Sequence, residues 1–244
     1  NEGTPGAFLT VNYNGDNSGN DGNYAMGADS QSKIAGSTTG AVSSNGLRIF
    51  RTVPTVAVTS NGGTLVAGGD LYKFTVTNPN SRDVVFQKFS FSIATSGSAA
   101  INAFTLYGNE VAFNNATSTS ASETVLEILG TGTSQAQIVP ANSTKTYVLR
   151  ASTVTNPSTT VVDSVTLALL ADTSYPSLAA LMGTVSSVEA GSANTDNIIW
   201  SPFSTTSPEA TAATQSNLDW TNGYGLPGFP SNAAFTVQTW NSVN

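Results

Sequence analysis

Hydrophobic and polar residues alternate in short runs along most of this chain, and Gly, Pro and Asn separate the runs. The segment Leu71–Thr77 alternates between apolar and polar residues, which is typical of a strand with one buried face. Similar runs recur about every 8–14 residues with turn-forming residues between them, a spacing that indicates a β-sandwich. The other predicted strands are Leu47–Thr52, Thr55–Thr59, Val84–Ala94, Ala103–Tyr107, Glu110–Phe113, Thr124–Leu129, Ala136–Val139, Lys145–Ser152, Val161–Ala171 and Ala234–Trp240.

The segment Val84–Ala94 is predicted to have one mostly apolar face and one mostly polar face. Strict alternation places Phe89 on the apolar face and puts Val84 and Phe86 on the polar side. No long helix is predicted, because β-branched residues dominate the runs. The one helix-like piece is Ser177–Thr184.

The pattern predicts an all-β protein: an antiparallel sandwich of the Ig-like or jelly-roll type over residues 47–244, ending in an irregular, tryptophan-containing tail. Residues 1–46 are rich in Gly and Asn and contain one candidate strand, Ala7–Tyr13. We interpret residues 1–46 as an extended N-terminal arm.

Composition changes the picture of the surface. Charged residues make up 9% of the 244 residues, whereas 31 are Ser and 34 are Thr, so the surface is expected to carry hydroxyl and amide groups. The net charge of -7 repels phosphate backbones, which argues against a nucleic acid partner. No apolar run approaches the roughly 20 residues of a membrane-spanning helix. With no Cys, the chain suits an extracellular or cell-surface location.

The absence of Cys and His also limits the chemistry. It excludes disulfides, thiolate nucleophiles and every catalytic triad that uses histidine. Carboxylate pairs remain, and Glu123 with Glu127 or Glu110 with Asp163 are the candidates for glycosidic hydrolysis. A Ser–Lys dyad lacks a Ser-x-x-Lys spacing in a helix. We interpret these groups as solvated surface charges and predict a protein that is not an enzyme.

Three sets of residues are candidates for binding or modification. An oxygen-rich cluster fits either a flexible turn or a Ca²⁺ site, and its members are Asp16, Asn20, Asp21 and Asp29. Asn115 and Asn142 begin sequences that match the N-glycosylation sequon. The aromatic residues of the tail form either a sugar-stacking surface or a packed cap on the sandwich. These residues are Trp200, Trp220, Tyr224 and Trp240.

Several short strings together resemble a known group of proteins. They are Arg51–Thr55, Leu71–Val76, Val139–Arg150, Ala171–Ser177, Ile199–Pro202 and Asp219–Gly228. The chain resembles large, secreted, Ser/Thr-rich surface proteins of candidate-phyla-radiation bacteria, which have sandwich domains in series. The resemblance covers residues 47–240. It implies a structural role at the cell surface, as an S-layer or filament subunit, and it carries over no catalytic residue.

The arm suggests how such a polymer assembles. An isolated strand is not stable alone, so the strand with Phe8, Leu9, Val11 and Tyr13 pairs either with its own domain or with the open edge of a neighbouring copy. Pairing between copies gives filaments or lattices, as in donor-strand complementation. We therefore expect a secreted structural subunit that forms a homopolymer. The alternative is a surface adhesive or carbohydrate-binding module with glycan partners.

Overall fold

The structure, a computed structural model, describes most of the sandwich and short pieces of the arm. The described residues are 8–9, 12–13, 24–26, 28–30, 33–35, 42–43, 47–48, 50–59, 63–98, 100–116, 124–130, 135–155, 162–174, 196–202, 220–228 and 237–241. These residues form strands and turns without a helix, so the predicted all-β class is confirmed. The helix-like piece predicted at Ser177–Thr184 lies outside the described residues.

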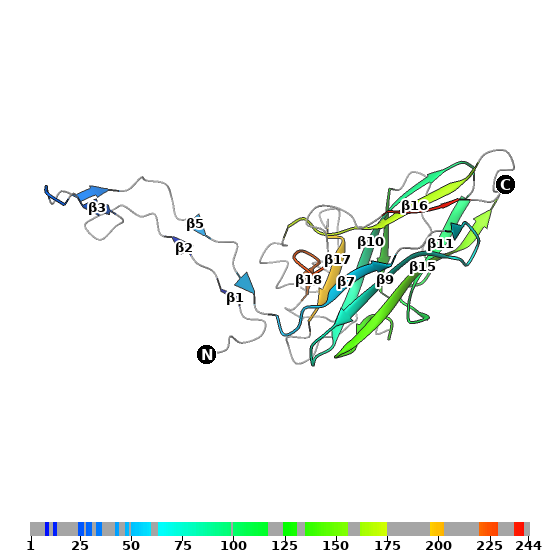
Figure 1. The fold of residues 1–244 in the computed structure, drawn as a ribbon, viewed down its shortest axis with the longest axis horizontal. Coiled ribbons are helices and arrows are strands. Elements are labelled where there is room, and N and C mark those ends of the chain that lie inside the picture. Colours follow the sequence, from blue (N-terminus) through cyan, green and yellow to red (C-terminus); the bar gives the residue numbers. More distant parts are fainter. Residues whose placement is uncertain are drawn as a thin grey trace. The chain divides into compact units, whose positions relative to one another are not determined.

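The chain divides into two compact units, Asn1–Ile49 and Phe50–Asn244 (Figure 1). The sequence places this boundary between residues 46 and 47. The difference concerns Leu47–Arg48, which the structure assigns to the first unit because it pairs with Phe8–Leu9.

The first unit contains three short antiparallel ladders that are nested, so that the segment folds back on itself. The pairs are β1 (Phe8–Leu9) with β6 (Leu47–Arg48), β2 (Asn12–Tyr13) with β5 (Val42–Ser43), and β3 (Tyr24–Met26) with β4 (Lys33–Ala35). Each ladder is two or three residue pairs long. Isolated two-stranded pairings are marginally stable in water. The described strands of this unit therefore hold one another weakly.

The second unit begins with a five-stranded antiparallel sheet. Its strand order is β12 (Val111–Ala112), β11 (Ala100–Gly108), β15 (Ser143–Thr155), β9 (Asp70–Asn78) and β7 (Thr55–Thr59). The alternation predicted for β9 is present: Phe74 and Val76 are buried, whereas Lys73 and Thr75 are half-buried.

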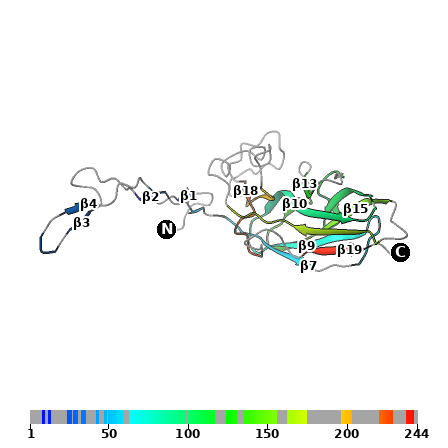
Figure 2. The same ribbon diagram turned by 90° about the horizontal axis from the view of Figure 1, so that it is seen from above.

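The second sheet is built around β10 (Val84–Ser96), which is paired along both edges (Figure 2). One edge carries β13 (Val125–Leu129) and β14 (Ile138–Val139), and the other carries β16 (Ser164–Leu169) and β17 (Ile198–Ser201). The remaining strands are β18 (Thr221–Asn222) beside β17, β19 (Gln238–Asn241) beside β16, and β8 (Gly63–Thr64), which pairs with β19 in parallel. Strands of the tryptophan-containing tail thus complete this sheet.

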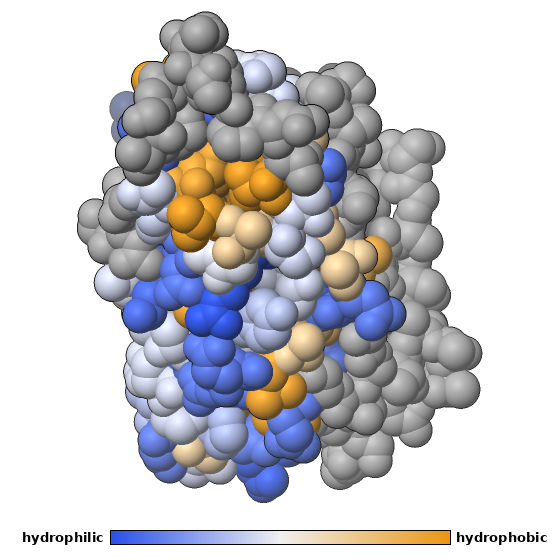
Figure 3. Space-filling model, turned by 90° about the vertical axis from the view of Figure 1, so that its right-hand side faces the viewer, coloured by the Kyte–Doolittle hydropathy of each residue, from blue (hydrophilic) through white to orange (hydrophobic). Residues whose placement is uncertain are grey.

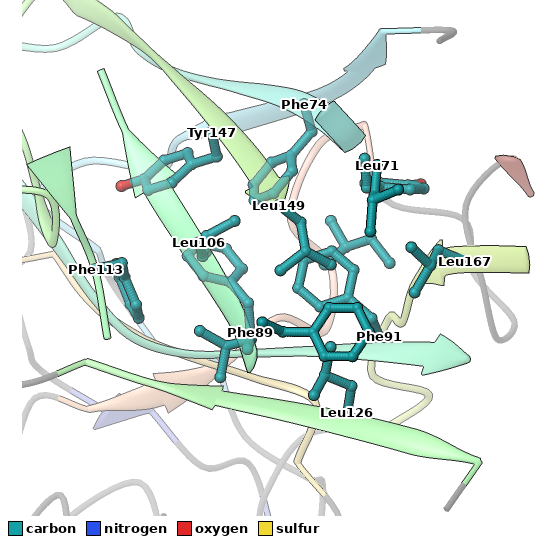
Figure 4. Packing of buried hydrophobic residues seen from close by; sticks show 14 of the residues in the cluster. Leu71, Phe74, Phe89, Phe91, Leu106, Phe113, Leu126, Tyr147, Leu149 and Leu167 are labelled. Atoms are coloured by element: carbon teal, nitrogen blue, oxygen red, sulfur yellow. The ribbon is translucent and has the colours of Figure 1, made fainter. Parts of the chain in front are cut away.

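Aromatic and branched side chains from both sheets fill the space between them (Figure 4). Phe74 of β9 stacks on Tyr147 of β15 with ring centroids 5.1 Å apart, and its edge meets Phe89 of β10 at 5.1 Å. Rings in such arrangements add attraction beyond the apolar area that they bury. The core joins the two sheets into one sandwich.

A β-bulge at Gln87 corrects the side-chain alternation predicted for β10. The register with β17 shifts between Phe86 and Lys88, and the extra residue of a bulge reverses the direction of the side chains before it. Val84 and Phe86 therefore join Phe89 in the core, so placing them on a polar face was wrong. The Gln87 side chain stays bonded within the bulge, because its Oε1 accepts from Gln137 Nε2 at 2.7 Å.

Candidate functional site

The three tryptophans proposed for an aromatic surface are buried. Their exposed fractions are 1% for Trp200, 0% for Trp220 and 8% for Trp240. The indole N–H groups of Trp200 and Trp240 donate to backbone carbonyl oxygens at 2.7 and 2.6 Å. Only Tyr224, among the four residues of this set, is exposed. The expectation of a sugar-stacking surface is corrected for the three tryptophans. Trp200 and Trp240 belong to the main core, and Trp220 packs with Val85 and Ile199 in a second buried cluster.

The proposed Ca²⁺ cluster is not assembled by the described residues. Asp16, Asn20 and Asp21 lie outside them, and Asp29 is exposed in a turn between β3 and β4. Within the described part of the chain, no group of three or more carboxylates comes together. The metal site stays a prediction.

Both sequon asparagines lie in exposed turns of the second unit. Asn115 follows β12. Asn142 has a φ of 51° in the turn between β14 and β15, and its backbone N–H donates to Asn80 O at 3.0 Å. The two side chains are accessible for modification.

The described carboxylates nominated for catalysis each have a partner of their own. Glu127 Oε1 lies 2.6 Å from Lys88 Nζ, and Asp163 Oδ1 accepts from Ser98 N at 2.5 Å. Glu110 accepts two hydrogen bonds from the Arg150 guanidinium, which lowers the pKa of its carboxyl. Glu123, the fourth candidate, lies outside the described residues. The described candidates thus form ion pairs and hydrogen bonds and do not face one another as a pair.

A buried carboxylate that the sequence analysis did not single out joins three distant segments. Asp172 follows β16, and it accepts hydrogen bonds from the backbone N–H groups of Asn197 at 2.6 Å, Ile198 at 3.2 Å and Gly223 at 2.7 Å. The pKa of Asp172 is raised to about 6, because burial, with a smaller contribution from nearby Asp196, outweighs the three N–H donors. Because these donors occupy its oxygens, Asp172 acts as a structural clamp.

Asn222 completes this junction. Its Nδ2 donates to Asp196 Oδ1 at 2.9 Å and to Ser174 O at 2.8 Å, and its Oδ1 accepts from Tyr224 N at 3.1 Å. Its backbone oxygen accepts the indole N–H of Trp200. Three of the strings noted in the sequence therefore meet here, and their polar residues hold the tail against the sandwich.

Two long edges of the sandwich are capped by groups from elsewhere in the chain. On β7, Val56 N donates to Pro227 O at 3.0 Å. On β11, the Asn114 side chain imitates a neighbouring strand: its Oδ1 accepts from Leu106 N at 2.8 Å, and its Nδ2 donates to Phe104 O at 3.2 Å. Capped edges cannot pair with another chain until the cap is displaced.

The proposed assembly strand is paired within its own unit. Phe8 and Leu9 lie opposite Arg48 and Leu47, and Tyr13 lies opposite Val42. Val11 lies outside the described residues. The strand therefore has a partner, but that partner is two residues long in each ladder.

Comparison with known proteins gives no match: no family model and no curated protein matches this chain. Among the described residues, no helix is long and apolar enough to cross a membrane.

Proposed function

We propose that this chain is a non-enzymatic structural subunit of an extracellular polymer, a filament or a surface lattice, assembled through β-strand pairing between copies. The observation that carries the proposal is the construction of the first unit. Its described strands form ladders of two or three residue pairs and belong to neither sheet of the sandwich. Such ladders are readily exchanged for a longer one, because an isolated two-stranded pairing is marginally stable.

The surface of the sandwich suits close packing of copies. Hydroxyl groups bridge neighbouring strands on the outer faces, in the pairs Thr77–Thr144 at 2.9 Å, Ser96–Ser164 at 2.7 Å and Thr166–Thr239 at 3.2 Å. Figure 3 shows one face on which residues of near-neutral hydropathy lie between hydrophilic residues and small hydrophobic groups. Neutral hydroxyls reduce the like-charge repulsion that an acidic chain meets when it associates with itself.

The resemblance to secreted surface proteins and the lack of cysteine also support an extracellular structural role. The alternative, an adhesive or carbohydrate-binding module, depends on an exposed aromatic face. Burial of Trp200, Trp220 and Trp240 removes that face.

Negative-stain electron microscopy of the full chain tests the proposal, with Ca²⁺ and then with a chelator. We expect regular filaments or lattices. Loss of the polymers in chelator would make Asp16 and Asp21 metal ligands in the assembly. Dispersed single particles in both conditions would refute the polymer.

Deletion of residues 1–13 tests the role of the arm. We expect the shortened chain to stay dispersed because the exchanged strand is gone, while circular dichroism shows the β-structure of the sandwich unchanged. Polymers formed by the shortened chain would exclude strand donation by this segment.

A further inference from the structure

Two five-residue strands, β7 and β13, lie at sheet edges of the sandwich. They differ in whether described residues bond to their outer edge. The free edge of β7 is capped at Val56, whose N–H donates to Pro227 O. The outer edge of β13 has no hydrogen-bond partner in the part of the chain that the structure describes. The strands at the other ends of the sheets, β8, β12 and β18, are only two residues long. Short or capped edges are the usual protection against pairing with another chain. β13 is five residues long, and none of the described residues caps its outer edge.

The hydrogen bonds to β10 fix which groups of β13 face outward. Ile93 N donates to Thr124 O at 2.9 Å at one end, and Gly130 N donates to Gln87 O at 2.8 Å at the other. Successive residues of an antiparallel strand direct their backbone N–H and C=O groups to opposite edges. Since Thr124 and Gly130 bond to β10, Leu126 and Ile128 also direct these groups toward β10. Val125, Glu127 and Leu129 therefore direct theirs to the open edge, as a ready template for another strand.

The side chains of these same three residues lie on the exposed face of the sheet. Val125 is 41% exposed and Leu129 is 40% exposed, and Glu127 lies between them. The Glu127 carboxylate is 2.6 Å from Nζ of Lys88, whose side chain is 2% exposed. The edge thus presents two apolar side chains on either side of an ion-paired acid whose side chain is 52% exposed and keeps its charge. On the inner face, Leu126 and Ile128 belong to the core.

Two copies could pair at this edge through β13 of each copy or through β13 and the segment 8–13, and charge favours the second arrangement. Antiparallel pairing of β13 with β13 of a second copy, with Val125 opposite Leu129, places Glu127 opposite Glu127. Like charges directly opposite each other on neighbouring strands are destabilising. The segment 8–13 contains no charged residue, so its addition brings no like charge to the edge. Its six residues are enough to span the five residues of β13.

We propose that β13 accepts the segment 8–13 of a second copy as an additional strand of the second sheet. This inference rests on the proposed polymer and names its acceptor. In the added strand, Leu9, Val11 and Tyr13 extend the inner face beyond Leu126 and Ile128. Phe8, Thr10 and Asn12 then lie on the outer face, with the Thr10 hydroxyl beside Glu127. Main-chain bonds provide the affinity, and the alternating side chains set the register.

Cysteine cross-linking tests the contact directly, because the chain has no cysteine of its own. With Thr10 beside Glu127, an antiparallel strand places Asn12 opposite Val125, and a parallel strand places Asn12 opposite Leu129. Full-length Asn12→Cys protein is mixed with differently tagged Val125→Cys or Leu129→Cys protein under mild oxidation. A disulfide heterodimer between two tagged chains reports contact between copies and not contact within one chain.

Val111→Cys is the matched control, because Val111 is 46% exposed and lies on the edge strand β12 of the other sheet. We expect several-fold more heterodimer with Val125→Cys or Leu129→Cys than with Val111→Cys. Enrichment at either position supports the proposal, and the preferred position gives the strand direction. Equal yields with all three partners would overturn it.

A blocking variant gives a second readout. Lysines on an edge strand oppose pairing, so Val125→Lys/Leu129→Lys should lose polymers in electron micrographs while Val111→Lys keeps them. Polymers that persist in the double variant, together with equal cross-linking, would mean that the polymer exists but β13 is not its acceptor. Absence of polymers in the unmodified chain would instead mean that the proposed function itself fails.

Discussion

Asp172 shows how backbone N–H groups can hold a single buried carboxylate. Burial disfavours its charged form and raises its pKa to about 6, whereas three backbone N–H donors favour the charge. Desolvation is the larger effect. The sequence marks the string around Asp172 but not its role, because its hydrogen-bond partners lie 25 to 51 residues away.

The raised pKa predicts how stability depends on pH. Between the unfolded value of 3.8 and about 6, the folded state holds this proton more tightly, so the contribution of Asp172 to the free energy of unfolding falls as pH rises. The shift corresponds to about 3 kcal/mol. In urea titrations from pH 4 to 7, the wild type should lose most of this amount relative to Asp172→Asn, which has no proton to release. A constant difference between the two proteins across this range would contradict the prediction.

At the scale of elements, the alternation of apolar and polar residues identifies strands, but it does not show which strands pair with one another. The positions of β9 and β15 follow from the sequence, because each has one face in the core and one in solvent. The bulge in β10 has no comparable signal, since both Phe86 and Gln87 fit an uninterrupted strand. Likewise, Thr124–Leu129 reads as a strand, but its place at an edge depends on pairing with distant segments. The candidate assembly site was therefore only half predictable: the donor segment stands out in sequence, and the acceptor does not.

Asn114 offers a test of edge capping. It is buried and bonds both Leu106 N and Phe104 O. Asn114→Ala should lower the free energy of unfolding by about 2–4 kcal/mol, because two buried backbone groups lose a partner. Asn115→Ala, at the exposed neighbouring position, should change it by less than about 0.5 kcal/mol. Urea unfolding followed by tryptophan fluorescence measures both, and equal effects would argue against a specific cap.

At the scale of the whole molecule, all of the identified core residues lie between Val56 and Trp240, within the second unit. The described strands of the first unit pair only with one another. In the proposed polymer, the exchanged strand thus comes from a part of the chain that contributes none of the identified core residues. A subunit built in this way can exchange arm strands without opening its core.

Removal of residues 1–49 should therefore leave the sandwich intact. We expect its melting temperature in calorimetry to stay within about 2–4 °C of that of the dispersed full chain, which corresponds to a change of about 1 kcal/mol for a domain of this size. A much larger fall would show that the first unit stabilises the core.

The parallel pairing of β8 with β19 has a mechanical consequence. Trp240 and Asn241 lie beside Gly63 and Thr64, and Leu65 N donates to Asn241 O at 2.9 Å. Tension that pulls residue 50 and residue 241 apart acts first on β7, which lies between residue 50 and β8. Once β7 has detached, the tension acts along β8 and β19 in opposite directions. The hydrogen bonds between the two strands are then loaded in shear, so they must break at the same time and not one after another. A pull on residue 241 would therefore be resisted by bonds that must break at the same time.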